Sequence, residues 1–570
     1  MKIRRLYIKE YKNIKDLELT FSSSLISLLI GKNGVGKSNL IEILALIFRG
    51  LDLSKTEEAL IAWPRNGDHF EYEIDYRCKG KEIRLVSTVE SFKAALLSIV
   101  NEEKVATEIQ IGQFLAEKSE SYLPDYVIGY YSGENKRIHE IIRPYAEIAW
   151  DNIKTAQGEQ ENFHRLFFVE NEHAQLILLT LLLYQGSPDL SDAFRNRVIR
   201  LLQSYTSFEE INELSVLLKN PVWYSPPPDD VQIQARANPD LFSDGPVEHF
   251  PPETDSAIFE DTLDESAYYG PNYNLGIDNL EEHLLSNSAP YPFWGMKGRA
   301  HQLLLSLYEN LERPLTYYPE EDEITGEAIE HIDFDSMNIE DIQRQVFSLF
   351  DHPLNFFEAL DTLLLVESLE KLTLTVRHRY AGDHFEFSQL SEGERQLFTV
   401  LGLLLITSQG DTLYLLDEPD THLNPRWQRD YISLLKDFSL NQENSHIIVA
   451  SHSPLLVQDA KDIDLFLFLR EGNQTIVDAD NYAIANWRID HVLASKYFDL
   501  PSTRPKALDE YMELRRSILS QATISKEDKS KLEALADEFG TLPTGETIEE
   551  IEMQLTLNQF IEKVSDDKNN

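Results

Sequence analysis

Residues 31–38 read GKNGVGKS: a glycine, four further residues, and then Gly-Lys-Ser. This is the complete P-loop pattern. The apolar run 25–30 (LISLLI) predicts a buried strand before the loop, and residues 39–48 (NLIEILALIF) predict a helix after it. Because the glycines let successive backbone N–H groups turn inward at the start of a helix, this stretch predicts a phosphate-binding site.

The residue types of this loop suit a nucleoside triphosphate with its magnesium ion. Lys37 is expected to reach the β- and γ-phosphates, and the Ser38 hydroxyl to bind Mg²⁺. The residues expected to bind ATP are Asn33, Gly34, Val35, Gly36, Lys37, Ser38 and Asn39. The sequence therefore predicts ATP and Mg²⁺ as cofactors.

The composition is that of a globular chain with an unusual charge. The 570 residues carry a formal net charge of -45, which disfavours non-specific binding to DNA or RNA and favours a basic protein partner. A local basic groove remains compatible with this charge. The single cysteine, Cys78, fits a reducing compartment. Residues 1–20 lack the apolar core of a signal peptide, and the longest apolar run, 397–406, is too short to span a membrane. We therefore expect a cytoplasmic protein without a membrane partner.

Apolar periodicity outlines the elements outside the loop. Alternating residues predict strands at 3–8, 17–21, 72–76, 83–89 and 372–378, and an apolar run predicts another at 126–131. The strands at 72–76 and 83–89 are expected to form an antiparallel extension of the first sheet. Amphipathic or buried patterns predict helices at 176–184, 193–205, 208–218, 294–311 and 339–369. The polar turn 132–135 either simply ends its strand or senses a γ-phosphate, and the sequence leaves both readings open.

Residues 226–290 differ in character from the segments around them. They contain nine prolines, fourteen Asp or Glu and one Arg. Such a composition does not support a compact core. It predicts an extended insertion that is either an interaction arm or a solvated loop without a partner.

A second group of motifs begins with residues 390–396 (LSEGERQ). Ser391 is a good N-cap of the following helix, and Glu394 three residues later completes a capping box. This cap is a sufficient structural reason for the motif. The functional alternative is that the helix N-terminus clamps a γ-phosphate bound to a second copy of the chain. The residues expected to act in this way are Ser391, Glu392, Gly393 and Glu394.

Two further predicted strands end in polar residues. Strand 413–416 (LYLL) precedes Asp417, which suits a Mg²⁺ contact, and Glu418, which suits polarisation of the attacking water. Asp420 follows at a position that can lie at a dimer seam. The strand HIIVA precedes His452, which can donate a hydrogen bond to the γ-phosphate. We therefore expect Glu418 and His452 to be the catalytic residues.

Together GKNGVGKS, LSEGERQ, LLDEPDTHLNP and ASHSP resemble the ABC-type AAA-family ATPases of the chromosome-maintenance (SMC), break-repair and RecF group. The resemblance covers about residues 1–50 and 385–460. It implies an α/β fold, in which an ABC-type P-loop domain is split by a long, mainly helical insertion. It also implies two copies packed head to tail around two ATP molecules, with Glu418 as the base and His452 as the switch histidine. Glu392 departs from the commoner glycine of the signature.

This resemblance divides the chain into four parts. The N-terminal lobe with the P-loop is residues 1–140, and the insertion with its acidic segment is 141–370. The C-terminal lobe with the signature, the Walker B carboxylates and the switch histidine is 371–484. The remainder, 485–570, is expected to be a helical acidic tail.

Three looser stretches are similar to ATPases of bacterial antiphage defence systems, among them PtuA of Septu systems and the retron-associated ATPases. They are LPDYVIGYYSGENKR (123–137), FHRLFFVENEHAQLILLTLLLY (163–184) and FWGMKG (293–298). The resemblance implies a regulatory ATPase that forms a homodimer or higher homo-oligomer and controls a separate HNH nuclease, which is PtuB in the Septu case. A retron version would also engage a reverse transcriptase and its DNA–RNA product.

Two alternatives remain open. A RecF-like repair ATPase would act directly on DNA, although the net charge weighs against it. A nuclease of the overcoming-lysogenization-defect type would carry a Toprim domain, which the pieces LREG (469–472) and VDAD (477–480) imitate. Asp478 and Asp480 would then bind metal. The two pieces lie only a few residues apart, whereas a Toprim domain needs a strand, a helix and a strand between them.

Overall fold

The structure is a computed structural model. It describes residues 1–62, 70–100, 103–133, 140–148, 165–221, 293–309, 316–321, 328–334, 339–479, 487–500, 506, 509–519 and 525–539, apart from a few single or paired positions within these ranges. The chain divides into two compact units, Met1–Ala485 and Asn486–Asn570. The acidic segment 226–290 and Asp480 lie outside the described residues.

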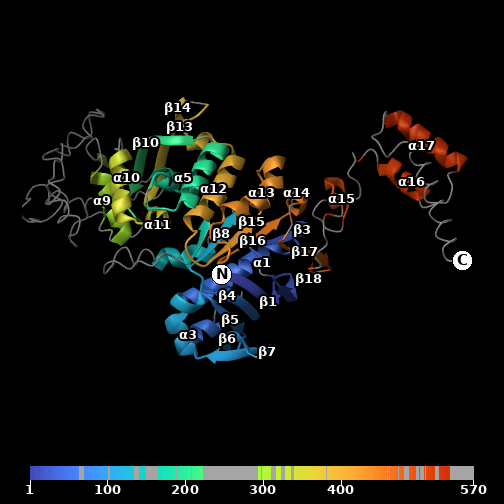
Figure 1. Cartoon of the computed structure of the whole chain (residues 1–570), viewed down its shortest axis with the longest axis horizontal. Coiled ribbons are helices and arrows are strands. Elements are labelled where there is room, and N and C mark those ends of the chain that lie inside the picture. Colours follow the sequence, from blue (N-terminus) through green and yellow to red (C-terminus); the bar gives the residue numbers. More distant parts are fainter. Residues whose placement is uncertain are drawn as a thin grey trace, which may run out of the picture. The chain divides into compact units, whose positions relative to one another are not determined.

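A seven-stranded sheet forms the centre of the first unit (Figure 1). Its order is β18-β17-β3-β16-β15-β8-β9, and all neighbours are parallel except β18. The strands are β3 (Ile26–Gly31), β8 (Tyr126–Tyr131), β9 (Leu166–Val169), β15 (Thr412–Asp417), β16 (Ser445–Ser451), β17 (Asp464–Glu471) and β18 (Gln474–Asp478). Strand β3 lies between β16 and β17, so this sheet is built from both ends of the unit.

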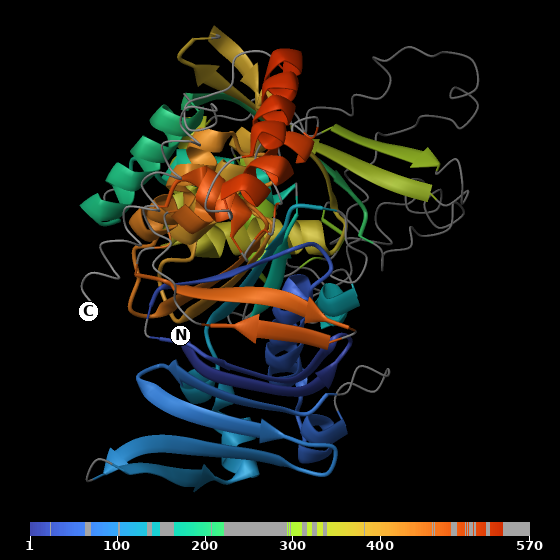
Figure 2. The same ribbon diagram turned by 90° about the vertical axis from the view of Figure 1, so that its right-hand side faces the viewer.

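A second, antiparallel sheet has the order β2-β1-β4-β5-β6-β7 and forms a separate layer, drawn in blue in Figure 2. Its strands are β1 (Lys2–Tyr11), β2 (Ile14–Thr20), β4 (Tyr72–Cys78), β5 (Lys81–Ser87), β6 (Phe92–Val100) and β7 (Glu103–Ile109). The short helices α2 (Glu57–Ala62) and α3 (Ile111–Glu117) accompany it. The predicted antiparallel extension of the first sheet is therefore confirmed.

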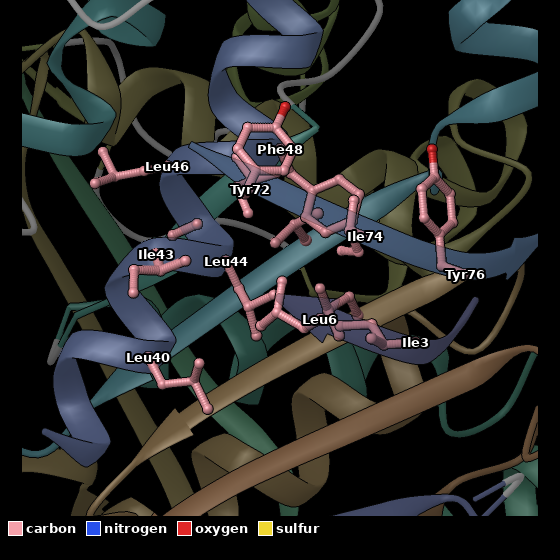
Figure 3. Close-up of a cluster of buried hydrophobic side chains, with 14 of the residues drawn as sticks. Ile3, Leu6, Leu40, Ile43, Leu44, Leu46, Phe48, Tyr72, Ile74 and Tyr76 are labelled. Carbon is pink, nitrogen blue, oxygen red and sulfur yellow. The ribbon is translucent and has the colours of Figure 1, made fainter. Parts of the chain in front are cut away.

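The helix that follows the P-loop, α1 (Lys37–Leu53), packs against both sheets (Figure 3). Its apolar side chains between positions 40 and 48 are all buried. On one side they join Leu6 and Ile74 in a single core cluster, and the rings of Phe48 and Tyr76 lie 5.8 Å apart in an edge-on contact. On the other side α1 contacts β3, β15 and β16. A helix covered on both sides keeps only a narrow stripe of half-buried polar residues, here Ser38, Glu42 and Arg49, which explains the nearly continuous apolar run after the loop.

The remaining elements of the first unit combine helices with a third sheet. The helices are α5 (His173–Tyr184), α6 (Asp192–Leu201), α9 (Gly298–Glu309), α10 (Ile339–Leu349), α11 (Pro353–Leu365), α12 (Glu392–Ile406), α13 (Pro425–Phe438) and α14 (Pro454–Gln458). The apolar helix α5 packs against both α11 and α12. The insertion therefore has contacts with the helix that begins at the signature motif, and the expected α/β class is confirmed.

The prediction of a helix at 208–218 is wrong, because this stretch is the strand β10 (Phe208–Lys219). It lies in the five-stranded sheet β11-β12-β10-β13-β14, whose other strands are β11 (Thr316–Glu321), β12 (Ala328–Phe334), β13 (Leu369–His378) and β14 (Gly382–Glu386). Leu214, Val216 and Leu218 are buried and alternate with less buried neighbours, which is the period of a strand. The first half, FEEINE, lacks this alternation and allowed the helical interpretation. The strands that pair with β10 lie more than a hundred residues away in the sequence, and this pairing makes the stretch a strand.

The second unit contains α15 (Ile489–Ala494), α16 (Asp509–Leu519) and α17 (Lys526–Phe539). These elements agree with the expected helical tail. Within the described part of the chain, no helix combines the length and the apolar character that a membrane crossing requires.

Candidate ATP site

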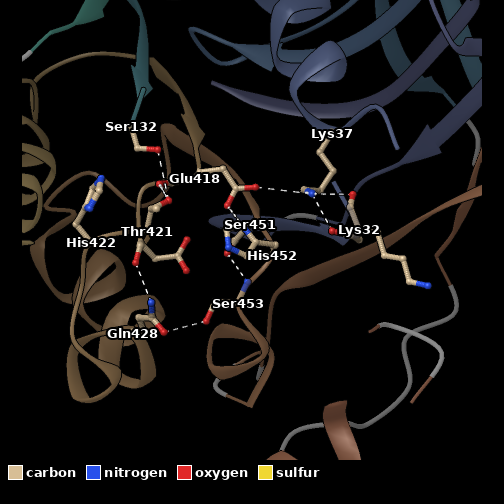
Figure 4. Close-up of polar contacts among 12 residues, drawn as sticks. Lys32, Lys37, Ser132, Glu418, Thr421, His422, Gln428, Ser451, His452 and Ser453 are labelled. Carbon is tan, nitrogen blue, oxygen red and sulfur yellow. Dashed lines mark hydrogen bonds and ion pairs between the residues drawn. The ribbon is translucent and has the colours of Figure 1, made fainter. Parts of the chain in front are cut away.

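The P-loop joins β3 to α1 and holds the side chain of Lys37 against its own backbone (Figure 4). The Lys37 ammonium donates hydrogen bonds to the carbonyls of Gly31 at 2.8 Å and Lys32 at 3.3 Å. The loop turns at Gly34 and Gly36, whose φ values of 78° and 110° favour glycine. Lys37 is only 4% exposed, and this burial lowers the pKa of its ammonium, while the carboxylates of Glu418 and Asp417 oppose the shift.

Glu418 brings the far end of the unit to this lysine. Its Oε1 lies 3.8 Å from the Lys37 Nζ, and its Oε2 accepts a hydrogen bond from Nδ1 of His452. The three side chains come from the P-loop, from the end of β15 and from the end of β16. The structure therefore brings together the predicted lysine, base and switch histidine at the carboxyl ends of the parallel strands β3, β15 and β16.

The backbone of Glu418 is strained. Its φ of 51° lies in the left-handed region that non-glycine residues seldom adopt. The conformation is held by neighbours, since the Glu418 N–H donates to the Ala450 carbonyl at 2.8 Å and the Glu418 carbonyl accepts from the Thr421 hydroxyl at 2.9 Å. Strain kept in place by its surroundings is characteristic of functional sites.

Ser38 and Asp417 have the chemistry and the placement for Mg²⁺. Asp417 ends β15 and pairs with Ala450 of β16, which in turn pairs with Leu29 of β3, two residues before the P-loop. Ser38 is in the first turn of α1. A hydroxyl and a carboxylate are the hard oxygen ligands that Mg²⁺ prefers beside phosphates.

Asp420 is buried, with 2% of its surface exposed. This burial raises the pKa of its carboxyl to about 6, although a hydrogen bond from Ser451 opposes the shift. The neighbouring Thr421 and His422 are exposed instead. Any contact of this loop with a second copy would therefore involve those two side chains more directly than the Asp420 side chain.

The signature motif forms the predicted helix cap at the start of α12. The Ser391 hydroxyl accepts from the Glu394 N–H, and the Glu394 carboxylate accepts from the Ser391 N–H at 3.0 Å. Glu392 points elsewhere, and its carboxylate lies 3.2 Å from Nε2 of His422. Gly393 packs so closely on the His422 carbonyl that an added Cβ would lie 2.4 Å from that oxygen. Ser391 and Glu392 are exposed, as contact with a second copy requires.

Three contact residues were missed by the sequence interpretation. Asn13 and Thr475 contact the P-loop, and Gln396 contacts the backbone of Glu418. Ser132 lies beside Asp417 and Thr421, which keeps the γ-phosphate sensor hypothesis for its turn open. Gln396 stands in the motif LSEGERQ, and Asn13 lies between the predicted strands 3–8 and 17–21, but nothing in the sequence singles out Thr475.

The piece LREG and the first two residues of VDAD, 477–478, lie on a hairpin. Strands β17 and β18 pair antiparallel with Glu471 opposite Gln474, so no helix or further strand separates the two pieces. Among the described residues, no group of three or more His, Cys, Asp or Glu is arranged to hold a metal ion.

Comparison with known protein families matches two segments of the chain. Residues 1–212 match the family described as "AAA ATPase domain". Residues 295–458 match the family described as "AAA domain, putative AbiEii toxin, Type IV TA system". The first match contains the P-loop. The second contains the signature motif, Glu418 and His452.

Two curated proteins are similar to parts of the chain. The Septu protein PtuA of Bacillus mycoides (strain KBAB4) is 21% identical over 270 residues, which are 44% of this chain and 37% of that protein. The "Retron Ec83 probable ATPase" of Escherichia coli is 26% identical over 180 residues, 29% of this chain and 31% of that protein. The chain thus spans about a third of the length of the curated relatives it matches.

Two solved structures are also similar at low identity. The SMC head domain from Thermotoga maritima aligns with a TM-score of 0.30 and 11% identity, over 85% of this chain and 100% of that chain. The SMC head bound to the C-terminal winged-helix domain of ScpA aligns with a TM-score of 0.29 and 12% identity, over 84% and 97%.

Proposed function

We propose that this protein, an AAA-family P-loop ATPase, is the ATP-dependent regulatory subunit of a bacterial antiviral complex. In this proposal two copies close head to tail around ATP, and the closed state controls a separate nuclease of the HNH type. One observation carries the ATP-dependent part: Lys37, Glu418 and His452 converge from opposite ends of the unit. The names of the two curated relatives support the antiviral setting.

The chemistry follows from the charges at the site. The Lys37 ammonium, which now contacts two loop carbonyls, would turn to the more strongly charged β- and γ-phosphates. Glu418 would then lose part of its attraction to Lys37 and would accept a proton from the attacking water. His452, which contacts the Glu418 carboxylate, would orient it and donate to the γ-phosphate. Mg²⁺ held by Ser38 and Asp417 would neutralise phosphate charge during the transfer.

Dimerisation is proposed because the signature residues are exposed in the single chain. Ser391 and Glu392 stand at the N-terminus of a 15-residue helix, where the helix dipole favours an anion. Their own capping contacts leave the N-terminal face of α12 accessible to a phosphate carried by a second copy. Hydrolysis would then require both copies and would report the state of the dimer.

The nuclease is proposed as a separate, basic partner. The chain carries a net charge of -45, which would attract a basic surface and hold nucleic acid away from the ATPase itself. A reverse transcriptase with its DNA–RNA product is a further partner if the complex is of the retron kind.

The variant Glu418→Gln tests the catalytic assignment and the dimer together. It removes the proton acceptor but keeps the shape of the side chain, so it should bind ATP, hydrolyse it at least about a hundredfold more slowly, and accumulate as a dimer. Light scattering with ATP and Mg²⁺ measures the dimer, and phosphate release measures turnover. Glu209→Gln, a paired glutamate on β10, is the matched control. Hydrolysis at the wild-type rate by Glu418→Gln would show that Glu418 is not the base.

Co-expression with the products of adjacent genes tests the partner. We expect a nuclease to co-purify and its activity to change with the nucleotide supplied. If instead the isolated chain bound duplex DNA only with ATP, with an affinity falling steeply with salt, a RecF-like role would replace this proposal.

A further inference from the structure

The P-loop is held from outside by two residues that belong to none of the recognised motifs. Asn13 lies in the turn between β1 and β2, and Thr475 lies in β18. We propose that Asn13 and Thr475 are positioning residues of the ATP site, which keep the P-loop in its phosphate-binding shape before nucleotide arrives. This inference rests on the proposed ATP site.

A phosphate-binding loop creates a need for such residues. When its N–H groups turn inward to meet phosphates, its carbonyls turn outward, and each buried carbonyl requires a hydrogen-bond donor. Two such donors belong to the loop and its helix. The Lys37 ammonium donates to the carbonyls of Gly31 and Lys32, and the Leu40 N–H donates to the Gly36 carbonyl at the start of α1. The carbonyl of Val35, a buried residue, must find its donor elsewhere in the fold, whereas Gly34 is exposed.

Thr475 supplies the donor for Val35. Its hydroxyl donates to the Val35 carbonyl at 2.6 Å, and the side chain is 2% exposed. The Thr475 N–H donates to the Asn13 carbonyl at 2.9 Å, which ties the two residues to each other. Gln474 adds a bond from its amide to the Lys15 carbonyl at 3.0 Å. The first residues of β18 are therefore hydrogen-bonded both to the P-loop and to the turn that carries Asn13.

Asn13 connects the middle of the loop to the start of α1. Its side-chain oxygen accepts from the Asn39 amide at 2.6 Å, and its side-chain nitrogen lies 3.5 Å from the Gly34 carbonyl. Asn39 is in the first turn of α1, so one asparagine contacts the chain on both sides of Lys37.

Gly36 makes this arrangement possible. A Cβ at Gly36 would lie 2.9 Å from the Thr475 hydroxyl and 3.1 Å from the Asn13 amide. The two side chains occupy the space that a side chain at position 36 would need. Their contacts therefore specify glycine there from the outer side of the loop, independently of the φ of 110°.

Thr475→Val tests the inference, because it removes the hydroxyl at nearly constant volume. The Val35 carbonyl would lose its donor and the loop its fixed shape, so we expect the Kd for ATP and the KM to rise about tenfold, with kcat changed less than about twofold. Thr475→Ser restores the hydroxyl and should recover most of the affinity. Isothermal titration with ATP, thermal unfolding without nucleotide and steady-state hydrolysis provide the three readouts.

Thr180→Val is the matched control. Its hydroxyl donates to the Leu176 carbonyl at 2.7 Å and is fully buried, but it lies in α5 of the insertion. This variant should lower the thermal stability without raising the Kd for ATP. Asn13→Ala provides an independent second variant, for which we expect a weaker but parallel loss of affinity.

The outcomes separate this inference from the proposed function. If wild type binds ATP and Thr475→Val binds it equally well, the positioning role is refuted while the ATP site stands. The positioning role is also refuted if Thr475→Ser is as impaired as Thr475→Val, or if Thr180→Val loses as much affinity. If wild type itself binds no ATP, and Lys37→Ala changes nothing, the proposed function fails first.

Discussion

Two carboxyl groups of this protein lie where burial opposes their ionised form. Burial raises the pKa of Asp420 to about 6 and that of Glu358, in α11, to about 7. Glu358 accepts hydrogen bonds from Arg299 and from the Tyr126 hydroxyl, the latter at 3.3 Å, and these contacts offset only part of the desolvation. Tyr126 begins β8, the strand whose far end lies beside Asp417. The insertion is thus joined to the ATPase sheet through a titratable group.

Glu358 should make the stability of the protein depend on pH. The folded state holds the proton up to about pH 7, whereas the unfolded state releases it near its ordinary value of 4.5. The free energy of unfolding should therefore fall as pH rises from about 5 to 7, by at most about 3 kcal/mol, and stay level above that range. Denaturant unfolding of wild type and Glu358→Gln at several pH values measures the difference. Identical pH profiles for the two proteins would contradict this assignment.

At the scale of the element, the start of α12 is hydrogen-bonded to the loop that carries Glu418, the proposed base. The Gln396 amide donates to the Glu418 carbonyl at 3.3 Å and accepts from the His422 N–H at 3.2 Å. Glu392 contacts the His422 side chain, and Gly393 packs on the His422 carbonyl. The helix that would touch the partner's nucleotide therefore also supports the strained backbone of Glu418 in its own chain.

Gln396→Leu should separate catalysis from binding. It keeps the volume but leaves the part-buried His422 N–H and Glu418 carbonyl without this partner, so Glu418 should lose its position. We expect kcat to fall about tenfold or more while the Kd for ATP changes less than about threefold. Gln343→Leu, which removes a comparable amide bond to the Leu183 carbonyl in the insertion, is the control. Equal losses of kcat in the two variants would show that the effect is general destabilisation.

Sequence reasoning succeeded where one motif or one local period carries the information. The P-loop, the capping box of Ser391 and the strands before Asp417 and His452 are all local patterns, and the structure contains each of them. It failed at β10, because that strand is specified by partners far along the chain. Thr475 could not be predicted either, since one threonine hydroxyl acquires its role only when β18 is placed against the loop.

At the scale of the whole molecule, the described ATP-site residues all lie within Met1–Ala485. We therefore predict that a chain ending at Ala485 binds ATP with a Kd within about twofold of the full chain, because Thr475 and the rest of β18 are retained. Isothermal titration of both proteins provides the measurement. A chain shortened further, ending before β17, is the contrasting variant and should not bind. An affinity loss above about tenfold for the chain ending at Ala485 would show that the second unit contributes to the site.

The position of β3 between β16 and β17 has a consequence for how the protein is made. A ribosome adds about 5–20 residues per second, so roughly 20–80 s separate the emergence of β3 from that of β16. During this interval the nascent P-loop strand has neither of its neighbours, and α1 lacks one of its two apolar covers. The early part of the chain therefore exposes apolar surface that is covered only once synthesis has passed β17. The P-loop therefore gains the contacts that surround it in the fold, including that of Thr475, only after the last strands of the sheet have been translated.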